Sequence, residues 1–166
     1  MVTRTTIIYS IAAAQRILNI KQGLYDVQEW AWVVWVRGKN FCRFMSKKAF
    51  KQHFIDHRKR AAQEIDLVIN HQDSSKFTAL GKSGNYQLTT TETGIVCTCE
   101  DYRNQLYHIG MGVCKHGYAV LNHLGFSSLS SYVDTQQENP RATMPDVRLS
   151  NQRPDGKRAP RGRSVD

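Results

Sequence analysis

The chain has 166 residues and a formal net charge of +9, with 23 Lys and Arg against 14 Asp and Glu. A chain of this length buries one moderate core or two small ones, which excludes a large multidomain enzyme. It contains no apolar run of about 18 residues, so the sequence predicts no membrane span. The basic excess favours an anionic partner, nucleic acid before an anionic membrane surface.

Near the amino terminus, apolar residues recur at helical spacing from Ile7 to Leu18. This pattern predicts an amphipathic core helix over residues 7–20. The same stretch lacks acidic residues, so an organellar transit peptide is the lesser alternative. A secretory signal is disfavoured because Tyr9 and Ser10 interrupt the apolar run.

The next apolar segment is typical of a β-hairpin, with strands at residues 30–36 and 41–45 around a turn at residues 37–40. Because the first strand is apolar on both faces, we expect it to lie centrally with cover on each side. Its three tryptophans are then expected to be core aromatics: Trp30, Trp32 and Trp35. The alternative is a platform on which unpaired bases stack, with phosphates contacted by Arg37, Lys39 and Arg43.

A basic helix is predicted next, with Ser46 as its N-cap and an end near Ile69. Its buried side is expected to hold Phe50, Phe54, Ala61, Ile65 and Val68. Its other sides are almost uniformly basic, since Asp56 is the one acid before Glu64. A solvated face is the plain interpretation. The nucleic-acid hypothesis assigns phosphate contacts to Lys47, Lys48, Lys51, Arg58, Lys59 and Arg60.

At the carboxyl terminus, residues 139–166 contain all four prolines and seven basic residues against three acids. So polar a segment buries too little surface to offset its ordering entropy. We therefore expect residues 134–166 to form a disordered basic tail. It is interpreted either as a solubility tail or as an arm that contacts phosphates through Lys157, Arg158, Arg161 and Arg163.

Between the basic helix and the tail, alternating patterns and turn residues predict three short strands at residues 77–80, 86–90 and 95–99. Helical spacing follows over residues 115–124, and Gly125 with Phe126 suits a Schellman-type stop.

Together these elements predict an α+β fold in three parts. Residues 1–70 form a helix, a hairpin and a basic helix, residues 71–133 form a small antiparallel sheet with a helix, and residues 134–166 form the tail.

The chemistry-bearing motif has the pattern C-x-C-x14-C-x-H and consists of Cys97, Cys99, Cys114 and His116. Alternate residues of a strand point to one face, so the first two sulfurs can converge on one ion. Residues two apart in a helix do not face each other, so we expect Cys114 at a helix cap and His116 in the first turn. Three thiolates and one imidazole complete a tetrahedral zinc site, with Zn–S of about 2.3 Å and Zn–N of about 2.0 Å. Four protein ligands leave no open position, which predicts one structural and non-hydrolytic Zn²⁺.

Other cysteines and histidines fit the pattern less well. His108, in the segment between the cysteines, is the alternative to His116, whereas His123 would lie about 10 Å further along the helix. Cys42 falls in an apolar strand and is expected to be a buried thiol. A disulfide framework is disfavoured by the close C-x-C pair. Free thiolates imply a reducing compartment, so we expect a cytoplasmic protein, nuclear if eukaryotic, and not a secreted one.

The motif and its neighbours resemble the SWIM-type zinc finger over about residues 77–125. The resemblance rests on the ligand pattern, on the run from Cys97 to Tyr102 and on the run from Cys114 to Leu121. Members of that family have a small sheet followed by a helix, and the resemblance implies zinc ligation by Cys97, Cys99, Cys114 and His116. They occur in chromatin remodellers, transposase-related proteins, recombination factors and small bacterial proteins. The implied roles are DNA binding or protein–protein interaction, here in a small stand-alone member.

The sequence thus favours a zinc-stabilised protein that binds nucleic acid, with DNA favoured over RNA. We expect no enzyme, because no nucleophile–base pair, paired carboxylates or vacant metal position is evident. The rival hypothesis is an interaction module of a larger complex, whose partner is a protein and which makes no direct nucleic-acid contact.

Overall fold

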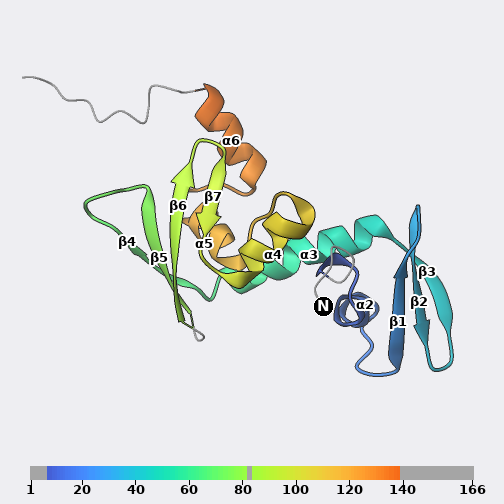
Figure 1. The fold of residues 1–166 in the computed structure, drawn as a ribbon. Coiled ribbons are helices and arrows are strands. Elements are labelled where there is room, and N and C mark those ends of the chain that lie inside the picture. The colour runs from blue at the N-terminus through green and yellow to red at the C-terminus, as the bar shows by residue number, and fades with distance from the viewer. Residues whose placement is uncertain (1–6, 82–83, 139–166) are drawn as a thin grey trace, which may run out of the picture.

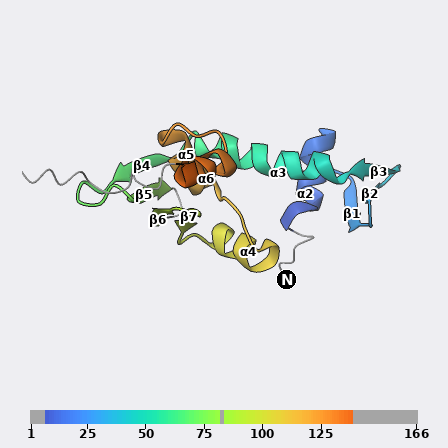
Figure 2. The ribbon, with the colours of Figure 1, turned by 90° about the horizontal axis from the view of Figure 1, so that it is seen from above.

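The computed structural model describes residues 7–81 and 84–138, which form an α+β fold (Figure 1). Two lobes lie at opposite ends of one long helix, α3, Lys47–Ala62, so the molecule is elongated (Figures 1 and 2). Residues 7–46 form the amino-terminal lobe, and residues 66–138 form the carboxy-terminal lobe. Within the described ranges, no helix has the length and apolar character needed to cross a bilayer.

The amino-terminal lobe begins with α2, Ile11–Leu18, which confirms the predicted helix with a later start. Its N-cap is Ser10, whose hydroxyl accepts the backbone N–H of Ala13 at 3.1 Å. An antiparallel sheet follows in the order β1-β2-β3, made of Leu24–Glu29, Val33–Gly38 and Cys42–Ser46. The sequence pattern missed β1, because its alternation is mixed with polar residues and a register shift interrupts its pairing between Leu24 and Asp26.

The central strand β2 is covered on one face only, whereas the sequence predicted cover on both faces. Val34 and Val36 point into the core and are fully buried, whereas the opposite face carries the half-buried Trp35. Trp30 and Trp32 precede the strand in a turn and are 50% and 86% exposed, so the prediction that they are core aromatics is wrong. The predicted strand began too early, because an apolar run by itself does not distinguish a strand from an aromatic turn.

Cys42 is also exposed, contrary to the prediction of a buried thiol. It is the first residue of β3, which is an edge strand with a single pairing partner. The apolar neighbours of Cys42 in the sequence suggested burial that an edge position does not provide.

Helix α3 begins after Ser46, as predicted, and the Ser46 hydroxyl accepts the backbone N–H of Ala49 at 3.1 Å. It ends at Ala62 and not near Ile69. The chain then forms β4, Asp66–Ile69, which pairs antiparallel with the next strand. Val68, predicted to line the buried side of the helix, is therefore 51% exposed on a strand.

The carboxy-terminal lobe contains an antiparallel sheet in the order β4-β5-β6-β7. The three predicted strands are confirmed as β5, β6 and β7, which span Lys76–Gly81, Gly84–Thr91 and Gly94–Cys97. Three helices pack around this sheet: α4, Glu100–Ile109; α5, Lys115–His123; and α6, Leu129–Glu138.

The end of α5 has the predicted Schellman geometry. Gly125 lies at φ 83°, the N–H of Phe126 donates to Leu121 O at 2.8 Å, and that of Gly125 to Asn122 O at 3.1 Å. Helices α4 and α6 were not predicted from the sequence. Because α6 continues to Glu138, the first residues of the predicted tail are helical. The remainder of that tail, with Lys157, Arg158, Arg161 and Arg163, lies outside the described residues.

Buried apolar side chains form two separate clusters in the described part of the chain. The amino-terminal cluster includes Val34 and Phe50, and the carboxy-terminal cluster includes Leu88 and Leu121. Helix α3 contributes to both, through Phe50 near its start and Ala62 at its end. The division into domains at residue 70 stays a prediction, although β4 already belongs to the second sheet.

Candidate metal centre

Four predicted ligands come together in the carboxy-terminal lobe. Cys97, Cys99, Cys114 and His116 are all buried, and their ligand atoms lie within 4.8 Å of one another. A buried set of three sulfurs and one imidazole can hold a metal ion.

Local structure explains how residues distant in sequence converge. Cys97 is the last residue of β7, Cys99 is the N-cap of α4, and Cys114 is the N-cap of α5. His116 lies in the first turn of α5, so the predicted positions of Cys114 and His116 are confirmed. The assumption that Cys99 still lies in the strand is wrong, because β7 ends two residues earlier and a helix begins at Cys99.

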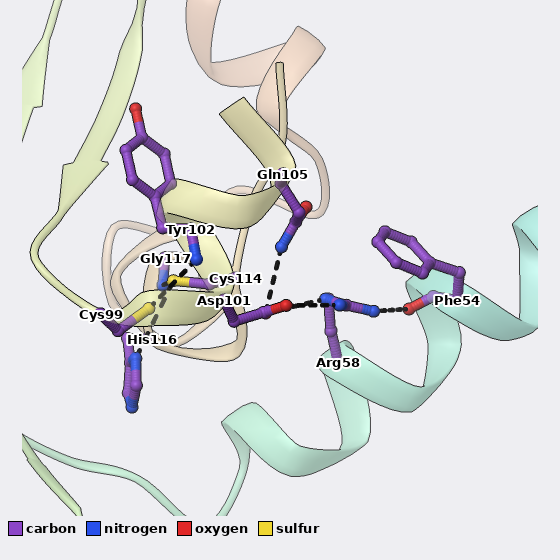
Figure 3. A network of polar contacts seen from close by, with 9 residues as sticks. All are labelled: Phe54, Arg58, Cys99, Asp101, Tyr102, Gln105, Cys114, His116 and Gly117. Carbon is purple, nitrogen blue, oxygen red and sulfur yellow. Dashed lines mark hydrogen bonds and ion pairs between the residues drawn. The ribbon is translucent and has the colours of Figure 1, made fainter. Parts of the chain in front are cut away.

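The two N-cap sulfurs accept backbone hydrogen bonds. The N–H of Tyr102 donates to Cys99 Sγ at 3.4 Å, and the N–H of Gly117 donates to Cys114 Sγ at 3.4 Å. The positive ends of two helices therefore meet at the sulfur cluster (Figure 3). This arrangement stabilises thiolates, which are the form of cysteine that binds a metal.

His116 presents its Nδ1 atom to the sulfurs, at 3.8 Å from Cys97 Sγ and 3.9 Å from Cys114 Sγ. In a tetrahedral zinc site a sulfur and a nitrogen ligand lie about 3.5 Å apart, as follows from the metal–ligand distances above. The observed separations are therefore close to those of a closed site. The ring also packs on Tyr86, with 4.5 Å between ring centroids, and its buried Nε2 has no hydrogen-bond partner within the described ranges.

The close packing of the sulfurs shifts their proton affinities in opposite directions. Hydrogen bonds from the thiols of Cys114 and Cys97 lower the pKa of Cys99, whereas contact with the sulfurs of Cys97 and Cys99, together with burial, raises the pKa of Cys114. Three thiolates at such short range repel one another, and a divalent cation between them offsets this repulsion. The donor set therefore fits a thiophilic divalent ion.

The alternative ligand His108 lies away from this cluster. It is located on α4 and not in a loop, nine residues beyond the N-cap Cys99. Nine helical residues span about 13 Å, so His108 is too distant to bind the same ion.

An ion-pair network connects the centre to α3 (Figure 3). Asp101, in the first turn of α4, accepts Arg58 Nη2 at 2.7 Å, Arg58 Nε at 3.1 Å and Gln105 Nε2 at 3.0 Å. Arg58 also donates from Nη1 to the backbone oxygen of Phe54 at 3.2 Å, and its guanidinium lies 3.5 Å from the centroid of the Phe54 ring. The network therefore holds the helix that begins at a candidate ligand against the helix that joins the lobes.

This network was not predicted, because the sequence pattern gave no prediction of α4. Two signals for the helix were present: the acidic first turn of Glu100 and Asp101, and Gly110, which ends the helix at φ 82°. Gly112 is a further position that the structure singles out. A Cβ atom there would lie 2.6 Å from the Cβ of the buried Gln105, so the close approach requires glycine.

Some basic side chains of α3 contact other residues, and the others are exposed. Lys47 pairs with Glu29 at 2.7 Å, and Arg58 pairs with Asp101, as described above. Lys59 lies 5.8 Å from the centroid of the Tyr118 ring. The exposed members of the predicted set are Lys48, Lys51 and Arg60.

Comparisons of the chain with family models, with curated proteins and with solved structures give no match. What the structure establishes is a buried Cys3His cluster that can hold a metal ion.

Proposed function

We propose that the protein is a small zinc-binding protein of the SWIM type, in which one structural Zn²⁺ holds β7, α4 and α5 together. The observation that carries this proposal is the convergence of four buried donors within 4.8 Å. Zinc is favoured over other divalent ions because a set of three thiolates and one imidazole suits a tetrahedral, borderline-soft cation. With four protein ligands no coordination position remains for water, so the proposed role is binding and not catalysis.

The zinc site is tested by elemental analysis of the purified protein and of two matched cysteine variants. Cys114→Ser removes a buried ligand, whereas Cys42→Ser removes an exposed thiol outside the cluster. We expect about one equivalent of zinc in the wild type and in Cys42→Ser, and loss of zinc in Cys114→Ser. Equal zinc content in the two variants would refute the assignment.

For the partner we propose DNA, contacted at its phosphates by the exposed lysines and arginine of α3. Lys48, Lys51 and Arg60 support this proposal, because they are exposed on one helix of a chain with net charge +9. Lys47 and Arg58 already form ion pairs, so we assign them a smaller part in phosphate contact. Contacts of this kind give salt-dependent affinity with little sequence preference.

A titration of labelled duplex DNA at several salt concentrations tests this partner. Log affinity falls as log salt rises, and each lost phosphate contact makes the magnitude of that slope smaller by about 0.9. We therefore expect the double variant Lys48→Gln/Lys51→Gln to have a smaller slope than the wild type. The control is Lys76→Gln, which removes an exposed lysine of β5 in the other lobe. Binding that does not weaken as salt rises would contradict the proposal.

A second candidate function is that of a protein-interaction module. It is favoured by three exposed apolar side chains on and after α4: Leu106, Tyr107 and Met111, which are 51%, 85% and 71% exposed. A pull-down from nuclease-treated lysate separates the two functions, since a protein partner survives nuclease and a nucleic-acid bridge does not. Loss of a captured protein in Tyr107→Ala would favour the interaction module.

A further inference from the structure

The amino-terminal sheet carries an exposed aromatic surface at the end of the molecule farthest from the metal centre. We define this aromatic face by Trp30, Trp32 and Phe44, which are 50%, 86% and 57% exposed. Trp30 and Phe44 contact each other edge to face, with 5.3 Å between ring centroids. Three exposed aromatic side chains in one small lobe exceed what solubility favours, which points to a binding role.

Strand register explains why Phe44 faces solvent. Trp35 lies directly opposite Phe44 on β3, and directly paired residues project from the same face of a sheet. Val34 pairs with Met45 on the other face, which is buried in the core. Helix α2 covers that inner face, and in both views no described element covers the outer one (Figures 1 and 2).

Two exposed lysines lie next to the strand that carries Phe44. Lys48 and Lys51 are exposed on the first turns of α3, which starts where β3 ends. Arg43 pairs with Val36 and therefore projects from the inner side of the sheet. Of the nearby acids, Glu29 forms an ion pair with Lys47 at 2.7 Å, and Asp26 lies directly opposite Arg37 on β2. No ion pair in the described part of the chain involves Lys48 or Lys51.

We propose that the aromatic face binds single-stranded DNA, with bases stacked on Trp30, Trp32 and Phe44 and phosphates contacted by Lys48 and Lys51. The combination is specific to unpaired strands, because bases within a duplex are already stacked on one another and present only their edges. A protein partner would also bury the three rings, but successive unpaired bases use their flat faces together with the neighbouring lysines. This inference rests on the proposed DNA binding and adds to it the form of DNA and the surface that selects it.

The test compares the affinity for a labelled oligothymidine of about 20 nucleotides with that for a duplex and an oligouridine of the same length. We expect the wild type to bind the oligothymidine most tightly and its tryptophan fluorescence to be quenched on binding. Trp32→Ala should bind the single strand about fivefold or more weakly, because stacking on one base contributes at least about that factor. Trp32→Phe should retain most of the affinity.

Two controls keep the result interpretable. Tyr107→Ala removes an aromatic ring that is 85% exposed, as exposed as Trp32, but lies on α4 of the other lobe. It should bind as the wild type does. Lys48→Gln/Lys51→Gln should lower the salt slope for the single strand by about 0.7 per lysine.

The outcomes separate this inference from the broader proposal. Duplex bound as tightly as the single strand, with no effect of Trp32→Ala, overturns the aromatic face while DNA binding through α3 survives. Absence of binding to every nucleic acid overturns both. Tighter binding of oligouridine overturns the assignment to DNA. A dimer in sedimentation that Trp32→Ala converts to monomer assigns the face to a second copy of the chain and overturns the inference.

Discussion

Breaking the ion pair between Arg58 and Asp101 should measurably destabilise the protein. The pair is bidentate, with N–O distances of 2.7 and 3.1 Å. Its two side chains differ in exposure, with Arg58 15% and Asp101 41% exposed. Exposed pairs contribute about 0.2–1 kcal/mol, and breaking fully buried pairs costs about 3–5 kcal/mol. Because solvent screens the carboxylate side, we expect a coupling near the top of the exposed range, about 1 kcal/mol.

A double-mutant cycle measures this coupling directly. The variants are Arg58→Met, Asp101→Ala and their combination, and the free energy of unfolding of the metal-loaded protein is obtained from urea titrations followed by circular dichroism. Methionine keeps most of the aliphatic contact with Phe54 while removing the charge.

The exposed pair of Lys76 and Asp73 is the matched control. Its side chains are 56% and 36% exposed, so we expect no resolvable coupling there. A coupling below about 0.3 kcal/mol for Arg58 and Asp101 would show that this ion pair positions α4 against α3 without stabilising the fold.

Three further predictions concern a buried leucine, the pH dependence of stability and removal of the metal. Leu88, 1% exposed and paired directly with Cys97, should cost about 3 kcal/mol when changed to Ala, as measured by urea unfolding. Burial, and then the charge of Arg16, lower the pKa of His53, so the unfolded chain binds more protons at mildly acidic pH and stability should fall as pH drops through about 6.5. Unfolding measured across that range should show a smaller loss in His53→Gln, and an equal loss would contradict the assignment. Removal of the metal by a chelator should expose residues 98–116 to protease. The tryptophan fluorescence should stay native, because all three tryptophans lie in the other lobe. A change in that fluorescence would show that the lobes unfold together.

Much of the carboxy-terminal lobe could be predicted because its signals are local. A glycine at a helix end, a cap position and a ligand spacing each depend on a few neighbouring residues, and the Cys114 cap and the Gly125 stop were found in this way. The three strands β5, β6 and β7 were predicted from the turns that contain glycine between them. The convergence of the four donors followed from the chemistry they share.

The amino-terminal lobe was harder to predict because burial there depends on distant parts of the chain. Trp32 and Val34 look equally apolar in the sequence, yet one is 86% exposed and the other is fully buried. What separates them is the start of β2 and the side on which α2 packs, which periodicity does not encode. The end of α3 was misplaced for a related reason: residues 66–69 satisfy a helical stripe, but pairing with β5 draws them into a sheet.

Helix α3 also sets the distance between the two lobes. Its 16 residues span about 24 Å, which is the distance covered by about seven steps of B-form DNA. Because the same helix is anchored in both hydrophobic clusters, the lobes cannot drift apart or fold onto each other without disrupting one of them. The helix therefore sets the separation of the two lobes: under the binding mode proposed above, an oligonucleotide held at the aromatic face would reach the carboxy-terminal lobe only if it extended beyond that span.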